Sequence, residues 1–336
     1  MEVTIAIPTY KTTSRIFKLL DTLRAQTYAN FRIFIVYKEW SGSRNIISEI
    51  KDYKGLEIGL QKQKSGYFEE ALNIIYAKAD GDIIIHTDDD AWVTKNWVRG
   101  HVEFHKKHKK VGMATGRVIE NILPDGKNVP FFKKLINKSK WLMNKHTIID
   151  TPIDKEFEDY TMYIGKSGML VDTGREYTMA KTLKQHGVNM SWKHDALEGF
   201  NLPGFTRYGG GNEACAALEV IKRGFMPVWF EGAQVFHPVH ESLSRSASVF
   251  TLPVGLTAER VLFSYYTKNI ARYGVDLDTL KLRNRLDILV SSFISNSAKK
   301  GYEMGYEIAK EAIEKSWSAK KVRKELITEL NKQVAP

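Results

Sequence analysis

The chain has 336 residues, of which 43% are hydrophobic and 26% are charged, and its formal net charge is +11 at pH 7. This composition is ordinary for a globular protein and excludes the collagenous, disordered and solenoid-repeat classes. The single cysteine, Cys215, cannot form an internal disulfide, which favours a reducing, cytoplasmic location. No stretch reads as a signal peptide or as a membrane-spanning helix, so we expect at most a peripheral contact with a membrane.

Apolar strands alternate with amphipathic helices over the first part of the chain. Strands are predicted at residues 3–7, 31–36, 56–60 and 82–86, and helices after Ser14 and at residues 45–53 and 69–79. Apolar strands joined by helices are typical of a parallel sheet covered by helices on both faces. Ligands bind such sheets beyond the carboxyl ends of the strands, so the residues that follow each strand are the first candidates for a site.

The remainder of the chain has a weaker pattern. Further strands are predicted at residues 112–118, 165–171, 226–230 and 234–236, and a helix at residues 212–223. From residue 257 onward the chain is mostly helical, and its last helix, at residues 318–333, is amphipathic and basic.

Positive charge is concentrated between residues 106 and 145. This basic segment contains Lys106, Lys107, Lys109, Lys110, Arg117, Lys127, Lys133, Lys134, Lys138, Lys140 and Lys145, opposed by Glu120 and Asp125. Such a cluster favours an anionic partner, such as a nucleotide, a phospholipid surface, a phosphate-bearing acceptor or a nucleic acid. A solvated basic surface without a partner is an equally open interpretation.

Three consecutive carboxylates, Asp88, Asp89 and Asp90, follow the strand at residues 82–86. Neighbouring carboxylates repel each other and lose hydration near a buried strand unless a cation compensates them. Alternate residues of an extended segment point the same way, so Asp88 and Asp90 can converge on one ion. Mg²⁺ or Mn²⁺, held by carboxylates and substrate phosphates, fits this pattern. The alternative is that Asp90 caps a following helix.

An ordered series of motifs resembles the family 2 glycosyltransferases of the GT-A fold. The series covers roughly residues 3–240 and consists of Ile7-Pro8-Thr9-Tyr10, Gln26-Thr27-Tyr28, Gly66, Ala71-Leu72-Asn73, Ala79-Asp80-Gly81-Asp82, Thr87-Asp88-Asp89-Asp90, Gly209-Gly210-Gly211-Asn212-Glu213, Arg223-Gly224-Phe225 and Val235-Phe236-His237. Each motif is weak alone, and their order carries the resemblance. It implies an α/β, Rossmann-like GT-A domain at residues 1–250, with a nucleotide-binding half (1–118) and an acceptor-side half (119–250), followed by a helical region at residues 251–336.

The resemblance also implies roles for single residues. Asp88 and Asp89 would contact the nucleotide, whereas Asp90, Asp88 and His237 would hold Mn²⁺ or Mg²⁺. Glu213 stands where the family places its catalytic base, usually an aspartate, and a carboxylate there can deprotonate an acceptor hydroxyl. The alternatives are that Glu213 is a carboxylate favoured by a helix dipole and that His237 is structural.

For the nucleotide pocket, the resemblance implies Pro8, Thr9, Tyr10 and Gly66. One departure concerns the end of the second strand, where the family commonly has a pair of aspartates. This chain has none there, and we expect Glu39 to supply the missing carboxylate.

Two features stay open. His240 is a second histidine near the implied metal site. The stretch between Gly168 and Gly209 is longer than the family leads us to expect, and it forms the acceptor side, a mobile lid or a packed insertion. This stretch contains Trp192, His194, Asp195, Phe200, Phe205 and Tyr208, whose types suit sugar faces and hydroxyls.

The leading hypothesis is a metal-dependent, inverting glycosyltransferase of the hexosyltransferase type. It would transfer a sugar from a UDP- or GDP-linked donor to a hydroxyl of a glycan, a lipid-linked glycan or a polysaccharide. The alternatives are a nucleotide- or polyanion-binding protein of the same fold and a sugar nucleotidyltransferase, and nucleic acid is the less expected partner. The basic last helix predicts a peripheral contact with the inner face of a membrane.

Overall fold

The computed structural model describes residues 1–11, 14–41, 43–119, 147–174, 178–238, 254–292 and 295–334. The chain divides into two compact units. The first comprises Met1–Asn128, Tyr177–Leu202 and Glu213–Val239, and the second comprises Val129–Glu176, Pro203–Asn212 and His240–Pro336. The domain limits at residues 118 and 250 stay a prediction. His240 and the part of the basic segment from residue 120 onward lie outside the described residues.

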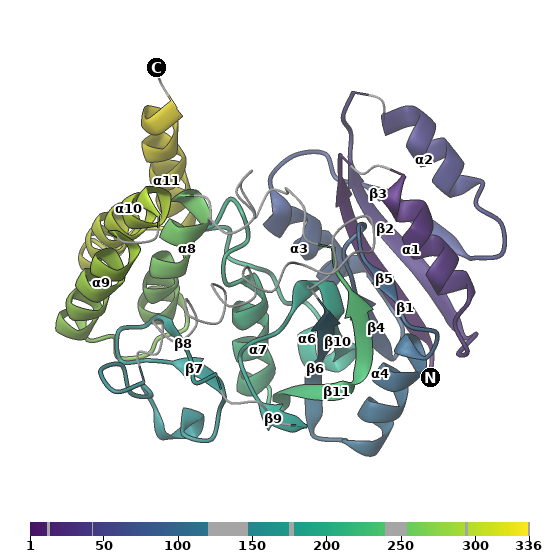
Figure 1. Cartoon of the computed structure of the whole chain (residues 1–336), viewed down its shortest axis with the longest axis horizontal. Helices are drawn as coiled ribbons and strands as arrows, with labels where there is room; N and C mark the ends of the chain where they lie inside the picture. The colour runs from purple at the N-terminus through teal and green to yellow at the C-terminus, as the bar shows by residue number, and fades with distance from the viewer. Residues whose placement is uncertain are drawn as a thin grey trace. The chain divides into compact units, whose positions relative to one another are not determined.

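A mixed sheet forms the centre of the first unit (Figure 1). Its order among the described residues is β3-β2-β1-β4-β10-β6-β11-β5, and β9 pairs with β11. The strands are β1 (Val3–Tyr10), β2 (Phe31–Lys38), β3 (Ile58–Lys62), β4 (Ile83–His86), β5 (Trp92–Val93), β6 (Val111–Ile119), β9 (Met179–Lys181), β10 (Met190–Lys193) and β11 (Met226–Phe236). The first four strands pair in parallel, as do β6 and β11, whereas β10 is antiparallel to both of its neighbours. The predicted α/β fold is confirmed.

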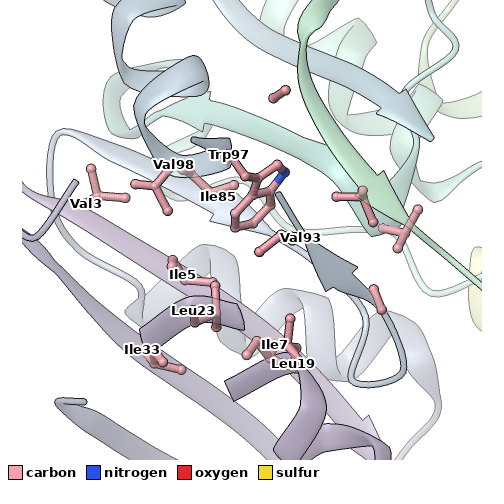
Figure 2. Packing of buried hydrophobic residues seen from close by; sticks show 14 of the residues in the cluster. Val3, Ile5, Ile7, Leu19, Leu23, Ile33, Ile85, Val93, Trp97 and Val98 are labelled. Carbon is pink, nitrogen blue, oxygen red and sulfur yellow. The ribbon is translucent and has the colours of Figure 1, made fainter. Parts of the chain in front are cut away.

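Helices cover the sheet of the first unit. They are α1 (Arg15–Arg24), α2 (Ser43–Lys51), α3 (Phe68–Lys78), α4 (Trp97–Lys107), α6 (His194–Leu197) and α7 (Asn212–Lys222). Ile5 and Ile7 of β1 point to the same face because strand side chains alternate, and there they lie in one core with Leu19 and Leu23 of α1 and Trp97 of α4 (Figure 2). The apolar side chains of α1 recur about every 3.6 residues, so they lie on one face of the helix and form one side of this core.

Aromatic side chains pack the opposite face of the sheet. Trp192 of β10 lies opposite Ile84 in the strand register, on the face away from the core that contains Ile5 and Ile7. The ring of Tyr76 from α3 lies 5.3 Å from that of Trp192 and 5.3 Å from that of Phe200, centroid to centroid. Trp192 is thus part of the central sheet, and the interpretation of this part of the long stretch as a lid is wrong.

The second unit is mainly helical, which confirms the predicted C-terminal helices. It contains η1 (Lys155–Phe157), β7 (Met162–Ile164), β8 (Leu170–Asp172), α8 (Val254–Tyr265), the π-helical turn η3 (Tyr266–Ile270), α9 (Leu277–Ser292), α10 (Asn296–Glu314) and α11 (Ala319–Val334). Close packing of α10 on α8 depends on Gly301 and Gly305. A Cβ at Gly305 would lie 2.7 Å from the Ala258 carbonyl oxygen. Among the described helices, none is both long and apolar enough to cross a membrane.

Several element predictions differ from the structure. The predicted strand at residues 165–171 is wrong, because a turn separates β7 from β8 and is closed by the Gly165 amide, which donates to Met169 O at 2.9 Å. The strands predicted at residues 226–230 and 234–236 form one strand, β11, whose pairing with β6 shifts between Trp229 and Gln234. The sequence pattern predicts neither α4 nor β10.

Candidate active site

The candidate site lies at the carboxyl edge of the sheet. The chain leaves β1 towards β2 on one side, and β4 flanks β1 on the other, so the edge of the sheet beyond β1 and β4 is a topological switch point. Asp88, Asp89 and Asp90 follow β4, and Thr9 at the end of β1 donates a hydrogen bond from its hydroxyl to the Asp89 carboxylate. Because β11 runs in the same direction as β4, His237 emerges at the same edge.

Asp88, Asp90 and His237 form a compact group of candidate metal ligands. His237 Nε2 lies 3.3 Å from Asp90 Oδ1 and 3.9 Å from Asp88 Oδ2, and all three candidate ligand atoms lie within 4.8 Å of one another. The side chains of Asp88, Asp90 and His237 are 34%, 18% and 13% exposed. Ligands about 2.1 Å from one octahedral cation lie roughly 3.0–4.2 Å apart, so this donor set fits Mn²⁺ or Mg²⁺.

The alternative role of Asp90 as a helix cap is wrong. The helix that follows, α4, begins at Trp97 and has Asn96 at its N-cap position. The two-residue strand β5 lies between them and pairs with β11 at Val235 and Phe236. This pairing fixes the segment after Asp90 beside the strand end that precedes His237.

Glu213 occupies the first turn of α7, and its environment makes it a stronger base than an ordinary glutamate. Burial, opposed by a backbone hydrogen bond and assisted by the negative charge of Asp88, raises the pKa of the Glu213 carboxyl from 4.5 to about 7. The carboxylate also lies directly against Gly187, where an added Cβ would be 2.8 Å from Glu213 Oε1. Position 187 therefore has to be a glycine for Glu213 to keep this orientation.

His86 links β4 to the segment that faces Glu213. Its Nδ1 forms a hydrogen bond with the Gly187 carbonyl oxygen, and the Thr87 hydroxyl donates to Val188 O at 2.9 Å. Burial lowers the pKa of His86, so the ring is neutral and Nδ1 carries the proton that this bond requires. These bonds hold Gly187 and the strand that leads to Asp88 together.

The residues predicted to contact the nucleotide form two groups, the end of β1 and Gly66. Pro8 and Thr9 are buried at the end of β1, whereas Tyr10 is exposed beside them. Gly66 lies nearby, since its carbonyl oxygen accepts a hydrogen bond of 2.7 Å from Lys38 Nζ, which is also 5.6 Å from the centre of the Tyr10 ring.

At the end of β2, the side chains of Lys38 and Glu39 contact different residues. Glu39 is 56% exposed and forms an ion pair of 2.7 Å with Lys62. Lys38 instead points towards Tyr10 and Gly66, as its hydrogen bond shows. No pattern in the sequence selects Lys38, because only the fold brings Gly66 beside the end of β2.

Residues 4–153 match the family model described as glycosyl transferase family 2. The chain is similar in structure to the mannosyltransferase PcManGT from Pyrobaculum calidifontis, solved with GDP-Man and Mn²⁺, at 14% identity and a TM-score of 0.54, covering 99% of this chain and 87% of that one. No curated protein sequence matches the chain.

Two further structures are similar at the level of the fold. S. aureus TarS 1–349 in complex with UDP-GlcNAc aligns at 12% identity and a TM-score of 0.50, covering 94% of this chain and 92% of that one. GalNAc-T7 with UDP, GalNAc and Mn²⁺ aligns at 14% identity and a TM-score of 0.53, covering 94% of this chain and 58% of that one. Residues 4–153 therefore match the glycosyl transferase family 2 model, and the chain shares the GT-A fold of the similar structures.

Proposed function

We propose that the protein is a metal-dependent, inverting glycosyltransferase that moves a sugar from a nucleotide-diphosphate sugar to a hydroxyl acceptor. The observation that carries this proposal is the convergence of Asp88, Asp90 and His237 at one edge of the sheet. Glu213 lies close enough to Asp88 for the charge of one carboxylate to raise the pKa of the other. Such a group offers a cation site and a base within one unit of the protein.

Asp88, Asp90 and His237 would hold Mn²⁺ or Mg²⁺ through two carboxylate oxygens and one imidazole nitrogen. The bound cation would supply Lewis-acid stabilisation for the departing nucleoside diphosphate. Asp89, held by the Thr9 hydroxyl, would contact the nucleotide together with the end of β1. This division of roles leaves Glu213 for the acceptor.

Glu213 would accept the proton of the acceptor hydroxyl. The acceptor oxygen would form a bond to the anomeric carbon while the bond from that carbon to the diphosphate breaks on the opposite face, so the configuration inverts. A pKa of about 7 suits this task, because the carboxylate is substantially ionised at neutral pH and is more basic than an ordinary glutamate.

The proposed donor is a UDP- or GDP-linked sugar. Support comes from the three similar structures, which were solved with GDP-Man, with UDP-GlcNAc and with UDP. Lys38 supplies further support, because its ammonium group has donors beyond the one used by Gly66, and these can reach an acceptor atom of a nucleotide beside Tyr10.

The proposed acceptor is a glycan or a lipid-linked glycan, with α11 as a peripheral contact to an anionic membrane. The apolar side of α11 is buried through Val322, Leu326 and Leu330, whereas Lys320 and Lys324 are exposed. Such a contact would therefore be electrostatic and would weaken with salt. Sedimentation with anionic liposomes tests it, and equal binding by the Lys320→Gln/Lys324→Gln variant would remove α11 from the proposal.

The decisive assay for the reaction is release of nucleoside diphosphate from UDP- and GDP-sugars with Mn²⁺, with and without glycan acceptors. Asp90→Ala and Glu213→Gln should each lower the rate by roughly 10²-fold or more, whereas Asp52→Asn, an exposed control at the end of α2, should not. Full activity in both site variants would show that the assignment is wrong. Release of pyrophosphate would instead identify a nucleotidyltransferase.

A further inference from the structure

Lys38, at the end of β2 in the first unit, has hydrogen-bond donors to spare. Its Nζ donates a hydrogen bond of 2.7 Å to Gly66 O and lies 5.6 Å from the centre of the Tyr10 ring. An ammonium group has three donors and no acceptor. Gly66 uses one of them, and among the residues that the structure describes no carboxylate pairs with Lys38. Two donors are therefore available to a ligand at the end of β2.

The loop that presents the Gly66 carbonyl is fixed on both sides of that residue. Gln63 is 6% exposed, and its side-chain amide donates to Ser65 O at 2.9 Å and to Tyr67 O at 2.8 Å. The backbone amide of Gln63 donates to Tyr37 O at 2.7 Å, which ties the loop to the end of β2. The partner that orients Lys38 is thus in place before any ligand binds, and such preorganisation lowers the entropy cost of recognition.

Tyr10 provides an aromatic surface beside Lys38. Its ring is 41% exposed, and the ammonium groups of Lys11 and Lys38 lie 5.3 Å and 5.6 Å from its centre. An exposed aromatic ring is a platform on which a nucleobase can stack. A base stacked on Tyr10 would have one edge close to the Lys38 ammonium group.

The chemistry of Lys38 distinguishes between the bases. The N–H of uracil between its two carbonyl groups needs an acceptor, which an ammonium group cannot supply. The nearest carboxylate in the sequence, Glu39, is 56% exposed and pairs with Lys62 at 2.7 Å. Guanine presents two neighbouring acceptors, O6 and N7, whereas adenine presents N7 beside an amino donor. The two available donors of Lys38 therefore match guanine.

We propose that the nucleotide site is selective for guanine, with Lys38 donating to O6 and N7 of a base that stacks on Tyr10. The sugar donor is then GDP-linked rather than UDP-linked. This inference rests on the proposed function, since it names the base of the nucleotide-diphosphate sugar that the same site would bind.

Calorimetric titration of the wild type with Mn²⁺ and nucleoside diphosphates tests the base contacts directly. In 7-deaza-GDP a C–H group replaces N7, whereas inosine diphosphate keeps O6 and N7 and lacks the 2-amino group. We expect GDP to bind roughly tenfold more tightly than UDP and than 7-deaza-GDP. Inosine diphosphate should bind within about threefold of GDP, because Lys38 does not contact the 2-amino group.

Lys38→Met removes the donors and keeps an unbranched side chain. GDP should bind this variant about tenfold more weakly than it binds the wild type, and the difference between GDP and 7-deaza-GDP should shrink to within about twofold. Lys51→Met is the matched control, because Lys51 is an exposed lysine at the far end of α2, and this variant should keep the wild-type ratio.

Equal affinity of the wild type for GDP and 7-deaza-GDP would overturn the inference. A Lys38→Met variant that keeps the wild-type ratio of these affinities would also overturn it, because Lys38 would then contact the ribose or the diphosphate. If Lys38→Met does not fold, the base series in the wild type decides alone. Transfer from UDP-sugars without a preference for GDP-sugars would refute guanine selectivity and leave the proposed function intact. Absence of transfer from every nucleotide sugar would refute the proposed function instead.

Discussion

Acidification should destabilise the first unit through two fully buried histidines of α4, His101 and His105. His105 Nε2 lies 2.9 Å from Ser191 Oγ, which lies 2.8 Å from His101 Nδ1, and His101 Nε2 lies 3.0 Å from Asn189 Oδ1. When both imidazole rings are neutral, every donor in this series of hydrogen bonds meets one acceptor. Burial lowers the pKa of His101 to about 4 and that of His105 to about 3, so the folded protein keeps both rings neutral at mildly acidic pH.

The size of the effect follows from proton linkage. In the unfolded chain each imidazole has a pKa of 6.5, so below that pH the unfolded state binds more protons than the folded state. The stabilisation by the neutral rings is complete above pH 6.5 and is lost as the pH falls towards the folded pKa values. One pKa unit corresponds to about 1.4 kcal/mol. At about pH 5, each histidine therefore lowers the free energy of unfolding by roughly 2 kcal/mol, and the pair lowers it by roughly 4 kcal/mol.

Urea denaturation at about pH 7.5 and pH 5 measures this cost. The difference between the two free energies of unfolding should shrink by roughly 2 kcal/mol in His101→Gln or His105→Gln and by roughly 4 kcal/mol in the double variant. His108→Gln, at the half-exposed C-cap of α4, should leave the difference unchanged. An identical pH dependence in wild type and double variant would refute the reasoning.

Three further predictions concern the site. Gly187→Ala should lower turnover by on the order of tenfold without weakening nucleotide binding, because the new Cβ would displace Glu213. Gly274→Ala is the control, since an added Cβ there would meet nothing within 4 Å, and its turnover in the same kinetic assay should equal that of wild type. Lys38→Met should weaken UDP or GDP binding about tenfold in calorimetric titrations, whereas Glu39→Gln should change it less than about twofold. Turnover should fall as the pH drops below about 7, because the raised pKa of Glu213 leaves the base protonated there, and a pH–rate profile without that limb would contradict its role.

The long periodic elements of the fold are predictable from the sequence, whereas the short ones depend on distant partners. β1, β2 and α1 carry enough apolar positions at period 2 or 3.6 to be recognised locally. β10 has four residues, MSWK, and becomes a strand only because it pairs with both β4 and β6. The turn between β7 and β8 likewise depends on a residue outside it, because the Asp150 carboxylate accepts hydrogen bonds from the amide and the hydroxyl of Ser167.

The site shows the same division. Asp88, Asp90 and His237 were open to prediction, because each follows a recognisable strand and parallel strands end at one edge. The environment of Glu213 was not open to prediction from the sequence. Gly187 lies against Glu213, and His86 bonds to Gly187, only because segments distant in the sequence pack together.

Mn²⁺ binding in the presence of UDP or GDP, followed by electron paramagnetic resonance, tests the cation site most directly. We expect Asp90→Ala and His237→Ala to weaken Mn²⁺ binding by roughly 10-fold to 100-fold, whereas Glu213→Gln should bind Mn²⁺ as wild type does while losing transfer activity. Wild-type Mn²⁺ affinity in both ligand variants would show that Asp88, Asp90 and His237 do not hold the cation.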